Sequence, residues 1–313
     1  GTCLVGSEMC IRDRLIVISG ATAVGKTRLS IELAKKNKTS IFSSDSRQFY
    51  KELSIGTAKP SSEQLNEVSH YFINNKSIND IYSAGDYEKE IIIDLEKYFI
   101  NNNKAFLVGG SGMYVDAVCK GLDKLPKDLK IRNQLNTKLN KDGLESLQTK
   151  LKQLDPIHYE KIDLNNSQRI IRALEVCYIS SKPYSSFLKS EIKKRSFKII
   201  KFLLHLDKEK LYSNIDQRVN KMVEDGLFKE VKSLRAFKNL NALKTVGYNE
   251  VFNFLNGNIS KEDAIELIKV NTKKYAKRQM TWFKKDPTYH WIENTDINQS
   301  INEIQSKLIN IKP

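Results

Sequence analysis

The feature that most constrains the fold is the segment GATAVGKT at residues 20–27. It matches the phosphate-loop pattern G-x-x-x-x-G-K-S/T at every fixed position, and it lies between a β-branched apolar run, LIVIS, and a segment with helical spacing of apolar residues. Backbone N–H groups of such a loop surround a polyphosphate, Lys26 neutralises a terminal phosphate, and the Thr27 hydroxyl ligates Mg²⁺. The predicted phosphate-binding residues are Gly20, Ala21, Thr22, Ala23, Val24, Gly25, Lys26 and Thr27.

Two further segments predict neighbouring strands of an open parallel sheet. Residues 39–44 lead into Asp45, and residues 105–108 lead into GGS, which ends at Ser111. The carboxyl ends of parallel strands meet at one edge of a sheet, so the phosphate loop, Asp45 and Ser111 should converge there. A helix over residues 86–99 would form a crossover on the sheet. The expected fold class is α/β, a P-loop NTPase-like parallel sheet flanked by helices, with a mostly helical insertion domain.

The chain divides into three expected parts. Residues 15–122 and 198–313 should form the core, which is helical from residue 207 onward. Residues 123–197 are rich in Lys, Asn and Gln with helical periodicity, and they are expected to form a helical insertion in the core. Residues 1–14 (GTCLVGSEMCIRDR) lack the pattern of a signal peptide and resemble a translated adapter read, so we expect a non-native leader.

The charge balance points to a polyanionic partner. Lys and Arg number 52 against 37 acidic residues, a formal charge of +15. This charge favours nucleic acid, with a lysine-rich surface kept for solubility as the alternative. The four cysteines show no metal-ligand or disulfide spacing, and no apolar run reaches the length of a membrane span. A cytoplasmic protein without a membrane partner is expected.

Six sequence blocks together resemble the bacterial tRNA dimethylallyltransferase family, also called tRNA isopentenyltransferases or IPP transferases. They are GATAVGKT, SSDSRQFYKELSIGTAKP, LVGGSGMY, QRIIRALEV, KTVGYNE and KRQMTWF, in that order. The family commonly has Pro where Ala21 stands, which should change loop stiffness more than chemistry. The resemblance implies transfer of a dimethylallyl group from dimethylallyl pyrophosphate to N6 of adenosine 37 in the tRNA anticodon loop, with Mg²⁺, without ATP consumption and by a monomer.

The resemblance also assigns catalytic roles to four residues. Asp45 would accept a proton from N6, and the alternative role for this residue is the cap of a helix. Lys26, Thr27 and Arg218 would hold the departing pyrophosphate, which suits the bidentate guanidinium of Arg218. Without the resemblance, Arg218 would be interpreted as a solvated helix residue.

Further residues are predicted to contact the anticodon stem-loop. Residues 267–285 hold seven basic and no acidic side chains, which predicts a groove for a polyanion. Trp282 and Phe283 in this stretch fit a core position better than base stacking. The residues predicted to contact tRNA are Asp45, Ser46, Arg47, Gln48, Ser111, Arg132, Gln168, Arg169, Ile170, Ile171, Arg172, Lys244, Thr245, Val246, Gly247, Tyr248, Asn249, Lys273, Lys277 and Arg278.

Three other functions compete with this interpretation. A small-molecule phosphotransferase of the phosphate-loop class would use the same Lys26 and Thr27 with ATP as donor, but it leaves the basic stretch unexplained. An RNA-binding nucleotide switch would need Asp45 only as a cap. A relative that prenylates free adenine nucleotides would need neither the insertion nor the basic stretch.

Overall fold

The computed structural model describes residues 13–188 and 191–310, so only Asp13 and Arg14 of the predicted leader lie within the described part. The chain divides into two compact units, Gly1–Cys119 with Lys194–Pro313, and Lys120–Lys193. Within the described ranges, no helix has the length and apolar character that a bilayer crossing requires.

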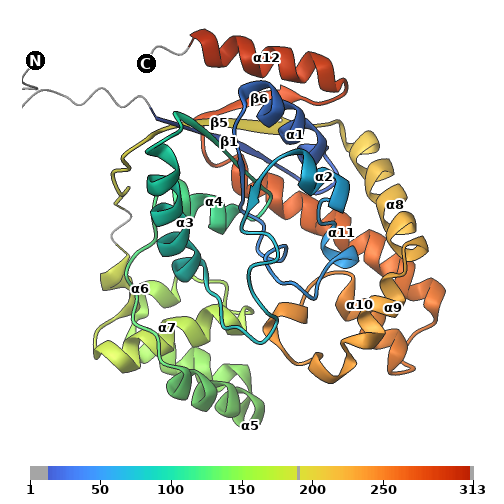
Figure 1. Ribbon diagram of the computed structural model, residues 1–313. Coiled ribbons are helices and arrows are strands. Elements are labelled where there is room, and N and C mark those ends of the chain that lie inside the picture. The colour runs from blue at the N-terminus through green and yellow to red at the C-terminus, as the bar shows by residue number, and fades with distance from the viewer. Residues whose placement is uncertain (1–12, 189–190, 311–313) are drawn as a thin grey trace, which may run out of the picture. The chain divides into compact units, whose positions relative to one another are not determined.

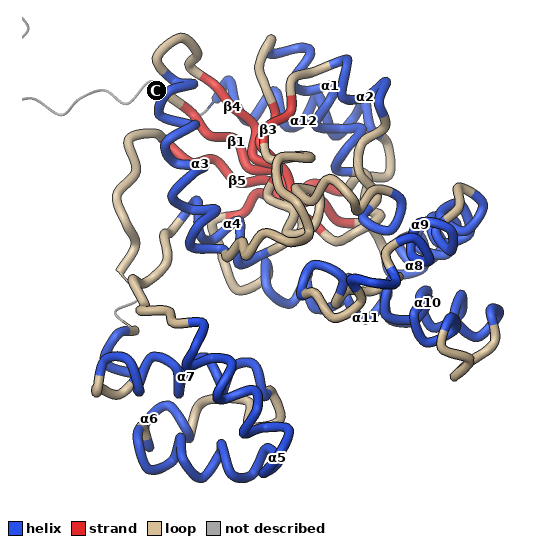
Figure 2. The backbone as a smooth tube through the Cα atoms, turned by 60° about the horizontal axis from the view of Figure 1, so that its bottom comes forward, coloured by secondary structure: helices blue, strands red, loops and turns tan. Residues whose placement is uncertain are grey.

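The first unit contains a six-stranded parallel sheet with the order β3-β2-β4-β1-β5-β6 (Figure 2). The expected α/β fold with a parallel sheet is thereby confirmed. The strands are β1 (Arg14–Gly20), β2 (Ile41–Ser43), β3 (His70–Tyr71), β4 (Lys104–Gly109), β5 (Lys198–His205) and β6 (Tyr289–Glu293).

Alternate side chains of β1 belong to two separate hydrophobic cores, as expected for a strand buried on both faces. Ile16 and Ile18 pack in the core that contains α1 (Lys26–Asn37) and α12 (Ile297–Asn310). Leu15 and Val17 pack in the core that contains α3 (Ala84–Phe99) and α4 (Gly112–Cys119). Figures 1 and 2 show these helix pairs on opposite sides of the sheet. The loop that follows β1 therefore starts from a strand fixed on both faces.

The remaining helices of this unit are α2 (Ser62–Glu67), α8 (Lys208–Glu224), α9 (Leu227–Ser233), α10 (Tyr248–Leu255) and α11 (Lys261–Phe283), with 3-10 turns η1 (Ile55–Thr57), η3 (Arg235–Phe237) and η4 (Asn241–Leu243). The expectation that the chain is helical from residue 207 onward is wrong at β6, a parallel edge strand beside β5. Only Tyr289 and Ile292 of β6 are buried. The strand therefore lacks the continuous apolar run that predicts a central strand.

An ion pair connects β5 with the loop before β6. Lys201 Nζ of β5 lies 2.9 Å from Asp286 Oδ2 of that loop. Burial opposes ionisation of Asp286, but hydrogen bonds from Thr288 and Lys201 outweigh it and hold the pKa of this carboxyl well below its usual range. Because the pKa of Asp286 is lower in the folded than in the unfolded state, the ionised carboxylate stabilises the fold at pH values above the unfolded-state pKa. This stabilisation is lost as the pH falls through the folded-state pKa.

We therefore expect Asp286→Asn to lower the Tm at pH 7, and the difference from the wild type to shrink below about pH 4. Thermal unfolding followed by circular dichroism at pH 7 and at pH 3 measures both differences. Asp142→Asn, which removes a carboxylate from an exposed position, should change the Tm little at either pH. An Asp286→Asn effect of equal size at both pH values would show that the ion pair is not its cause.

The second unit consists of α5 (Leu129–Leu154), α6 (Pro156–Tyr159), α7 (Ser167–Ser180) and the 3-10 turn η2 (Tyr184–Phe187). It begins at Lys120 and ends at Lys193, a few residues before the bounds of the predicted insertion. Leu147 and Leu151 of α5 pack against α7 in its core. Ile170 and Ile171, which were predicted to contact RNA, are instead buried in this core. Their helix presents its apolar face inward, so only its polar side chains remain candidates for RNA contact.

Candidate functional site

The phosphate loop joins the end of β1 to the start of α1. Ala23 and Gly25 adopt left-handed backbone conformations, with φ of 64° and 96°. A Cβ at Gly25 would lie 2.5 Å from Asn294 Nδ2, so both the conformation and the space require glycine here. No side chain caps the amino end of α1. The first N–H groups of the helix can therefore bind an anion.

Residues far away in sequence support this loop. Asn294, which follows β6 directly, donates from Nδ2 to the carbonyl of Val24 at 2.7 Å. Asn214 of α8 donates to the carbonyl of Ala23 at 3.2 Å. Sequence reasoning missed both residues, because a single asparagine in a helix or after an edge strand has no spacing signal.

Two cations lie at the loop. Lys26 Nζ donates to the carbonyls of Gly20 at 3.0 Å and Ala21 at 2.7 Å, and Arg218 Nη1 from α8 donates to Thr22 Oγ1 at 3.0 Å. Burial, with the neighbouring charge of Arg218, lowers the pKa of Lys26 to about 7, and burial also lowers the pKa of Arg218. An anion bound beside both groups would compensate this desolvation and repulsion. The arrangement thus favours a site for a multiply charged anion.

Asp45 lies just beyond the end of β2, and its Oδ1 accepts the backbone N–H groups of Arg47 at 2.9 Å and Gln48 at 3.3 Å. These bonds cap a turn rather than the helix that the alternative role assumed, because residues 46–49 form a turn. They engage one of the two carboxylate oxygens. Burial lowers the pKa values of Lys26 and Arg218, and the negative charge of Asp45 partly opposes this lowering at both cations. Capping and contact with a ligand at the loop are therefore compatible.

Ser111, at the end of β4, contacts the turn that follows Asp45. Its hydroxyl accepts the N–H of Ser46 at 3.0 Å and donates to Ser46 Oγ at 3.1 Å. The Arg47 guanidinium donates to the carbonyls of Asn241 at 3.0 Å and Lys244 at 3.4 Å. The carboxyl ends of β1, β2 and β4 thus bring the loop, the Asp45 turn and Ser111 together, as the parallel topology predicts.

The family model described as IPP transferase matches residues 48–286 of this chain. The chain belongs to the IPP transferase family. A protein of Flavobacterium johnsoniae named tRNA dimethylallyltransferase is 49% identical over 302 residues, covering 94% of this chain and 98% of that relative. The protein of the same name from Christiangramia forsetii is 47% identical, with coverage of 94% and 98%. The resemblance seen in the six sequence blocks is confirmed.

Solved structures agree with this assignment. The tRNA isopentenylpyrophosphate transferase of Bacillus halodurans is 33% identical with a TM-score of 0.70, covering 95% of this chain and 96% of that one. A eukaryotic dimethylallyltransferase, described as acting on tRNA, is 25% identical with a TM-score of 0.77, covering 96% of this chain and 78% of that one.

In this IPP transferase, the KTVGYN block is tied to the IGTAKP block by Glu230 of α9, a residue that sequence reasoning missed. Tyr248 is fully buried, and its hydroxyl donates to Glu230 Oε1 at 2.6 Å. The Glu230 carboxylate also accepts the backbone N–H groups of Ser54, Ile55 and Gly56. Tyr248 therefore positions the block, whereas the side chains of Lys244 and Asn249 are exposed and remain candidates for RNA contact.

Two of the arginines predicted to contact RNA are paired within the second unit. The Glu175 side chain is 1% exposed, and its carboxylate lies 2.5 Å from Arg132 Nη2 and 2.8 Å from Arg172 Nη1. Arg172 also donates to the carbonyl of Pro126. Both arginines keep part of their surface exposed, at 38% and 28% of the side chain. Glu175 therefore fixes their orientation, while the neighbouring Gln168 and Arg169 of α7 are exposed.

We expect Glu175→Gln to destabilise the second unit by about 1–3 kcal/mol, because a neutral amide cannot balance two arginines. If Arg132 and Arg172 bind RNA, the same change should raise the KM for tRNA and leave the KM for the prenyl donor unchanged. Chemical unfolding and steady-state kinetics measure these effects. Glu145→Gln, which removes the same charge from an exposed position of α5, is the matched control. A Glu175→Gln protein with wild-type stability would contradict the expectation.

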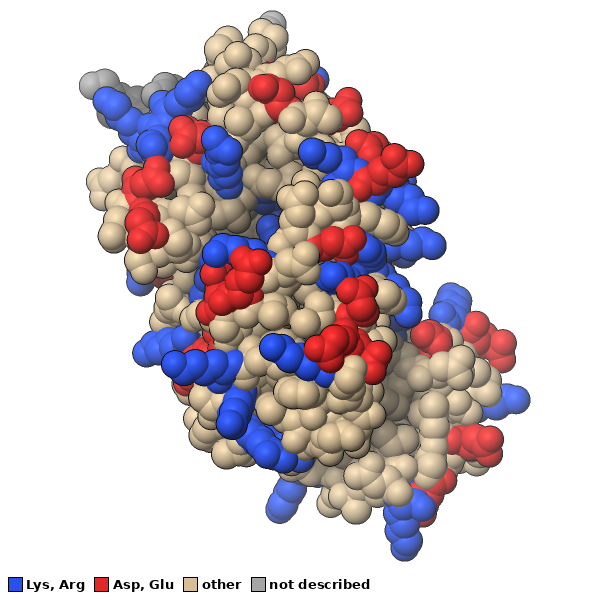
Figure 3. Space-filling view, turned by 90° about the vertical axis from the view of Figure 1, so that its right-hand side faces the viewer, with Lys and Arg blue, Asp and Glu red and all other residues tan. Residues whose placement is uncertain are grey.

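The basic stretch lies on α11, but its members differ in environment. Lys273 forms an ion pair with Asp216 at 2.7 Å, whereas Lys277 and Arg278 are exposed. Phe283 is buried as expected, but Trp282 is 38% exposed and donates from its indole to Asp116 at 2.9 Å. On the face shown in Figure 3, Lys and Arg side chains are interspersed with Asp and Glu. The net charge of the chain is therefore not gathered into one uninterrupted patch on that face.

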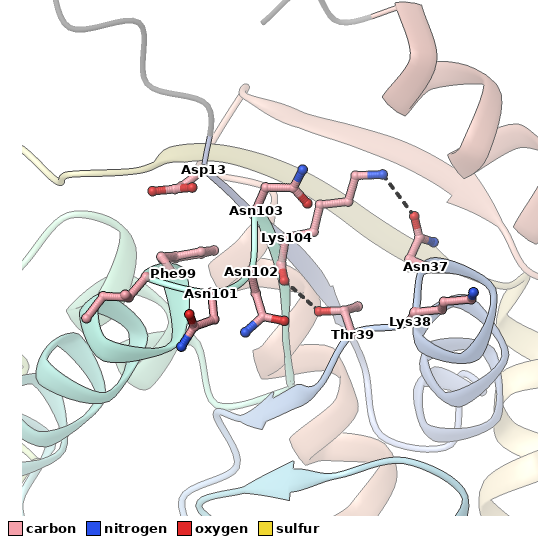
Figure 4. A pocket seen from close by; sticks show the side chains of 10 residues that line it. Asp13, Asn37, Lys38, Thr39, Phe99, Asn101, Asn102, Asn103 and Lys104 are labelled. Carbon is pink, nitrogen blue, oxygen red and sulfur yellow. Dashed lines mark hydrogen bonds between the residues drawn. The ribbon is translucent and has the colours of Figure 1, made fainter.

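A hollow of about 470 Å³ lies at the opposite, amino-terminal edge of the sheet (Figure 4). It is lined by residues at the starts of β1 and β4 and at the ends of α1 and α3, where Thr39 Oγ1 donates to the carbonyl of Lys104 and Lys104 Nζ donates to Asn37 Oδ1. None of the predicted site residues lines it. This hollow is therefore separate from the site at the carboxyl edge of the sheet.

Proposed function

We propose that this protein transfers the dimethylallyl group of dimethylallyl pyrophosphate to N6 of adenosine 37 in the anticodon loop of tRNA, giving N6-(dimethylallyl)adenosine and pyrophosphate. The observation that carries the proposal is that the carboxyl ends of the neighbouring strands β1, β4 and β2 bring together the phosphate loop, with Lys26 and Arg218, and the turn that begins at Asp45. The names of the relatives support the substrate and the donor.

The reaction requires opposite charges on its two sides. The bond from N6 to the first carbon of the dimethylallyl group forms as the bond from that carbon to the pyrophosphate oxygen breaks. The Asp45 carboxylate accepts the proton that N6 loses. Lys26, Arg218 and the N–H groups at the start of α1 receive the charge that develops on the pyrophosphate. Each group therefore stabilises charge that is larger in the transition state than in the bound substrates.

We also propose that Mg²⁺ takes part in donor binding. Within residues 13–188 and 191–310, no three His, Cys, Asp or Glu side chains are grouped to hold a metal ion. This fits an ion that takes most of its ligands from pyrophosphate and water, with the hydroxyl of Thr27 in the first turn of α1 as a protein ligand. When bound, Mg²⁺ would supply further positive charge to the leaving group.

The RNA would approach from the side of the Asp45 turn. An adenine that reacts at N6 must leave the base stack and present its edge to Asp45. The proposed contacts with the rest of the anticodon loop are the exposed polar residues of the KTVGYN and QRIIR blocks and of α11.

We propose that the protein is a cytoplasmic monomer. The described cysteines, Cys119 and Cys177, are both buried, and neither forms a disulfide, which is compatible with a reducing compartment.

The choice of donor separates this proposal from a phosphate-loop kinase or nucleotide switch. Purified protein with Mg²⁺ and unmodified tRNA should release pyrophosphate from dimethylallyl pyrophosphate in step with RNA modification. It should release no phosphate from ATP. Release of phosphate from ATP, with no pyrophosphate from the prenyl donor, would favour the kinase or the switch instead.

A further inference from the structure

Gln279 of α11 joins two loops of the site that are far apart in sequence. Its Oε1 accepts the N–H of Thr22 in the phosphate loop at 2.8 Å, and its Nε2 donates to the carbonyl of Gly110, after β4, at 2.8 Å. The side chain is 6% exposed. Both polar atoms of a buried amide are therefore satisfied by backbone groups, one on each loop.

The space around this amide is filled on the β4 side. A Cβ added to Gly110 would lie 2.3 Å from Gln279 Nε2 and 3.1 Å from the carbonyl oxygen of Gly20. The backbone at Gly110 thus approaches both the amide and the start of the phosphate loop. The second glycine of the GGSG segment is required by this close approach.

The segment that Gln279 holds leads to the other side of the site. Gly110 is followed directly by Ser111, whose hydroxyl accepts the N–H of Ser46 and donates to Ser46 Oγ. Ser46 is the residue after Asp45. Gln279 is therefore connected, through the segment after β4, to the turn that carries the Asp45 carboxylate.

We propose that Gln279 is a positioning residue that sets the distance between the prenyl donor on the phosphate loop and the adenine beside Asp45. This proposal rests on the proposed function. It identifies Gln279 as a residue that keeps the two parts of that site at the correct separation. Gln279 binds neither substrate. Because displacement of reacting groups by about 1 Å can cost about 10²-fold in rate, loss of this bridge should act on kcat.

Gln279→Glu and Gln279→Met test the bridge. The glutamate keeps an acceptor for Thr22 but places a carboxylate against the Gly110 carbonyl, and the methionine keeps the approximate side-chain volume without either hydrogen bond. We expect both variants to lower kcat by about 10-fold to 100-fold, with KM values for tRNA and for dimethylallyl pyrophosphate within about 2-fold of the wild type. Gln299→Glu, the same change at an exposed position of α12, should leave kcat unchanged.

Gly110→Ala disturbs the bridge from its other end and leaves α11 intact. Combined with Gln279→Met, it should lower kcat little further than either change alone, because both remove the same contact. Fully additive losses, or Gln279 variants with wild-type kcat, would overturn the proposal. So would a Gln279 variant that is folded by circular dichroism but has lost affinity for the donor, since that result would make Gln279 a binding residue.

If the Gln279 variants do not fold, Gly110→Ala alone decides the matter, with a lowered kcat at unchanged KM values as the expected result. These outcomes are distinct from failure of the proposed function. In that case the wild-type protein itself would form no prenylated nucleoside.

Discussion

Asp45→Asn is expected to lower kcat by about 10²-fold or more, while the dissociation constants for tRNA and dimethylallyl pyrophosphate stay near those of the wild type. Asparagine retains an oxygen that can accept the N–H groups of Arg47 and Gln48, so the turn after β2 should keep its shape. What it loses is the ability to take the proton from N6. Single-turnover kinetics with saturating donor measures the effect on the chemical step.

Asp45→Ala provides the comparison, because it removes the proton acceptor and the cap together. A loss in Asp45→Asn close to that in Asp45→Ala would assign most of the effect to proton transfer. If Asp45→Asn kept the wild-type rate while Asp45→Ala did not, the carboxylate would act only as a cap, and the assigned chemistry would be wrong.

Arg218→Gln is expected to lower kcat/KM for dimethylallyl pyrophosphate by about 10²-fold to 10³-fold, with little change in the affinity for tRNA. Arg218 donates a hydrogen bond to Thr22 inside the phosphate loop. Burial lowers the pKa of Arg218, because a charged guanidinium is costly to keep in a site with little water. A pyrophosphate would gain from this charge as the bond to carbon breaks.

Arg218→Lys should recover part of the loss, because it restores the charge without the two-pronged geometry of the guanidinium. Arg235→Gln, at an exposed position, controls for the general effect of charge on RNA binding. An Arg218→Gln protein that loses tRNA affinity but processes the donor normally would place Arg218 at the RNA rather than at the leaving group.

The strongest local patterns predicted the architecture. The apolar runs before Gly20 and Gly109 form the neighbouring strands β1 and β4, and the loops that follow them meet in the structure. These strands could be predicted because a parallel strand that is buried on both faces is apolar along its whole length. The edge strand β6 escaped prediction because only two of its five residues are buried, one on each face, so that it shows neither a continuous apolar run nor a clear alternation. Its Asn294 nevertheless supports the phosphate loop.

The parts of the site that sequence did not predict depend on long-range pairing. Glu230 and Gln279 are ordinary polar residues on helices, and only the folded chain shows that each binds backbone groups of segments far away in sequence. Arg132 and Arg172 were predicted from the sequence as RNA contacts, but the sequence did not reveal that both also pair with the buried Glu175. Charge and spacing identify candidate RNA contacts. Only the folded structure shows which of these side chains also bind other groups of the protein.

The most direct test is mass spectrometry of an unmodified tRNA transcript after incubation with the purified protein, Mg²⁺ and dimethylallyl pyrophosphate, with digestion to nucleosides and to anticodon-loop fragments. We predict an adenosine heavier by one dimethylallyl group in the fragment that contains position 37, and none in a transcript with guanosine at that position. Unmodified nucleosides throughout, or a modified adenosine elsewhere in the molecule, would contradict the proposed reaction.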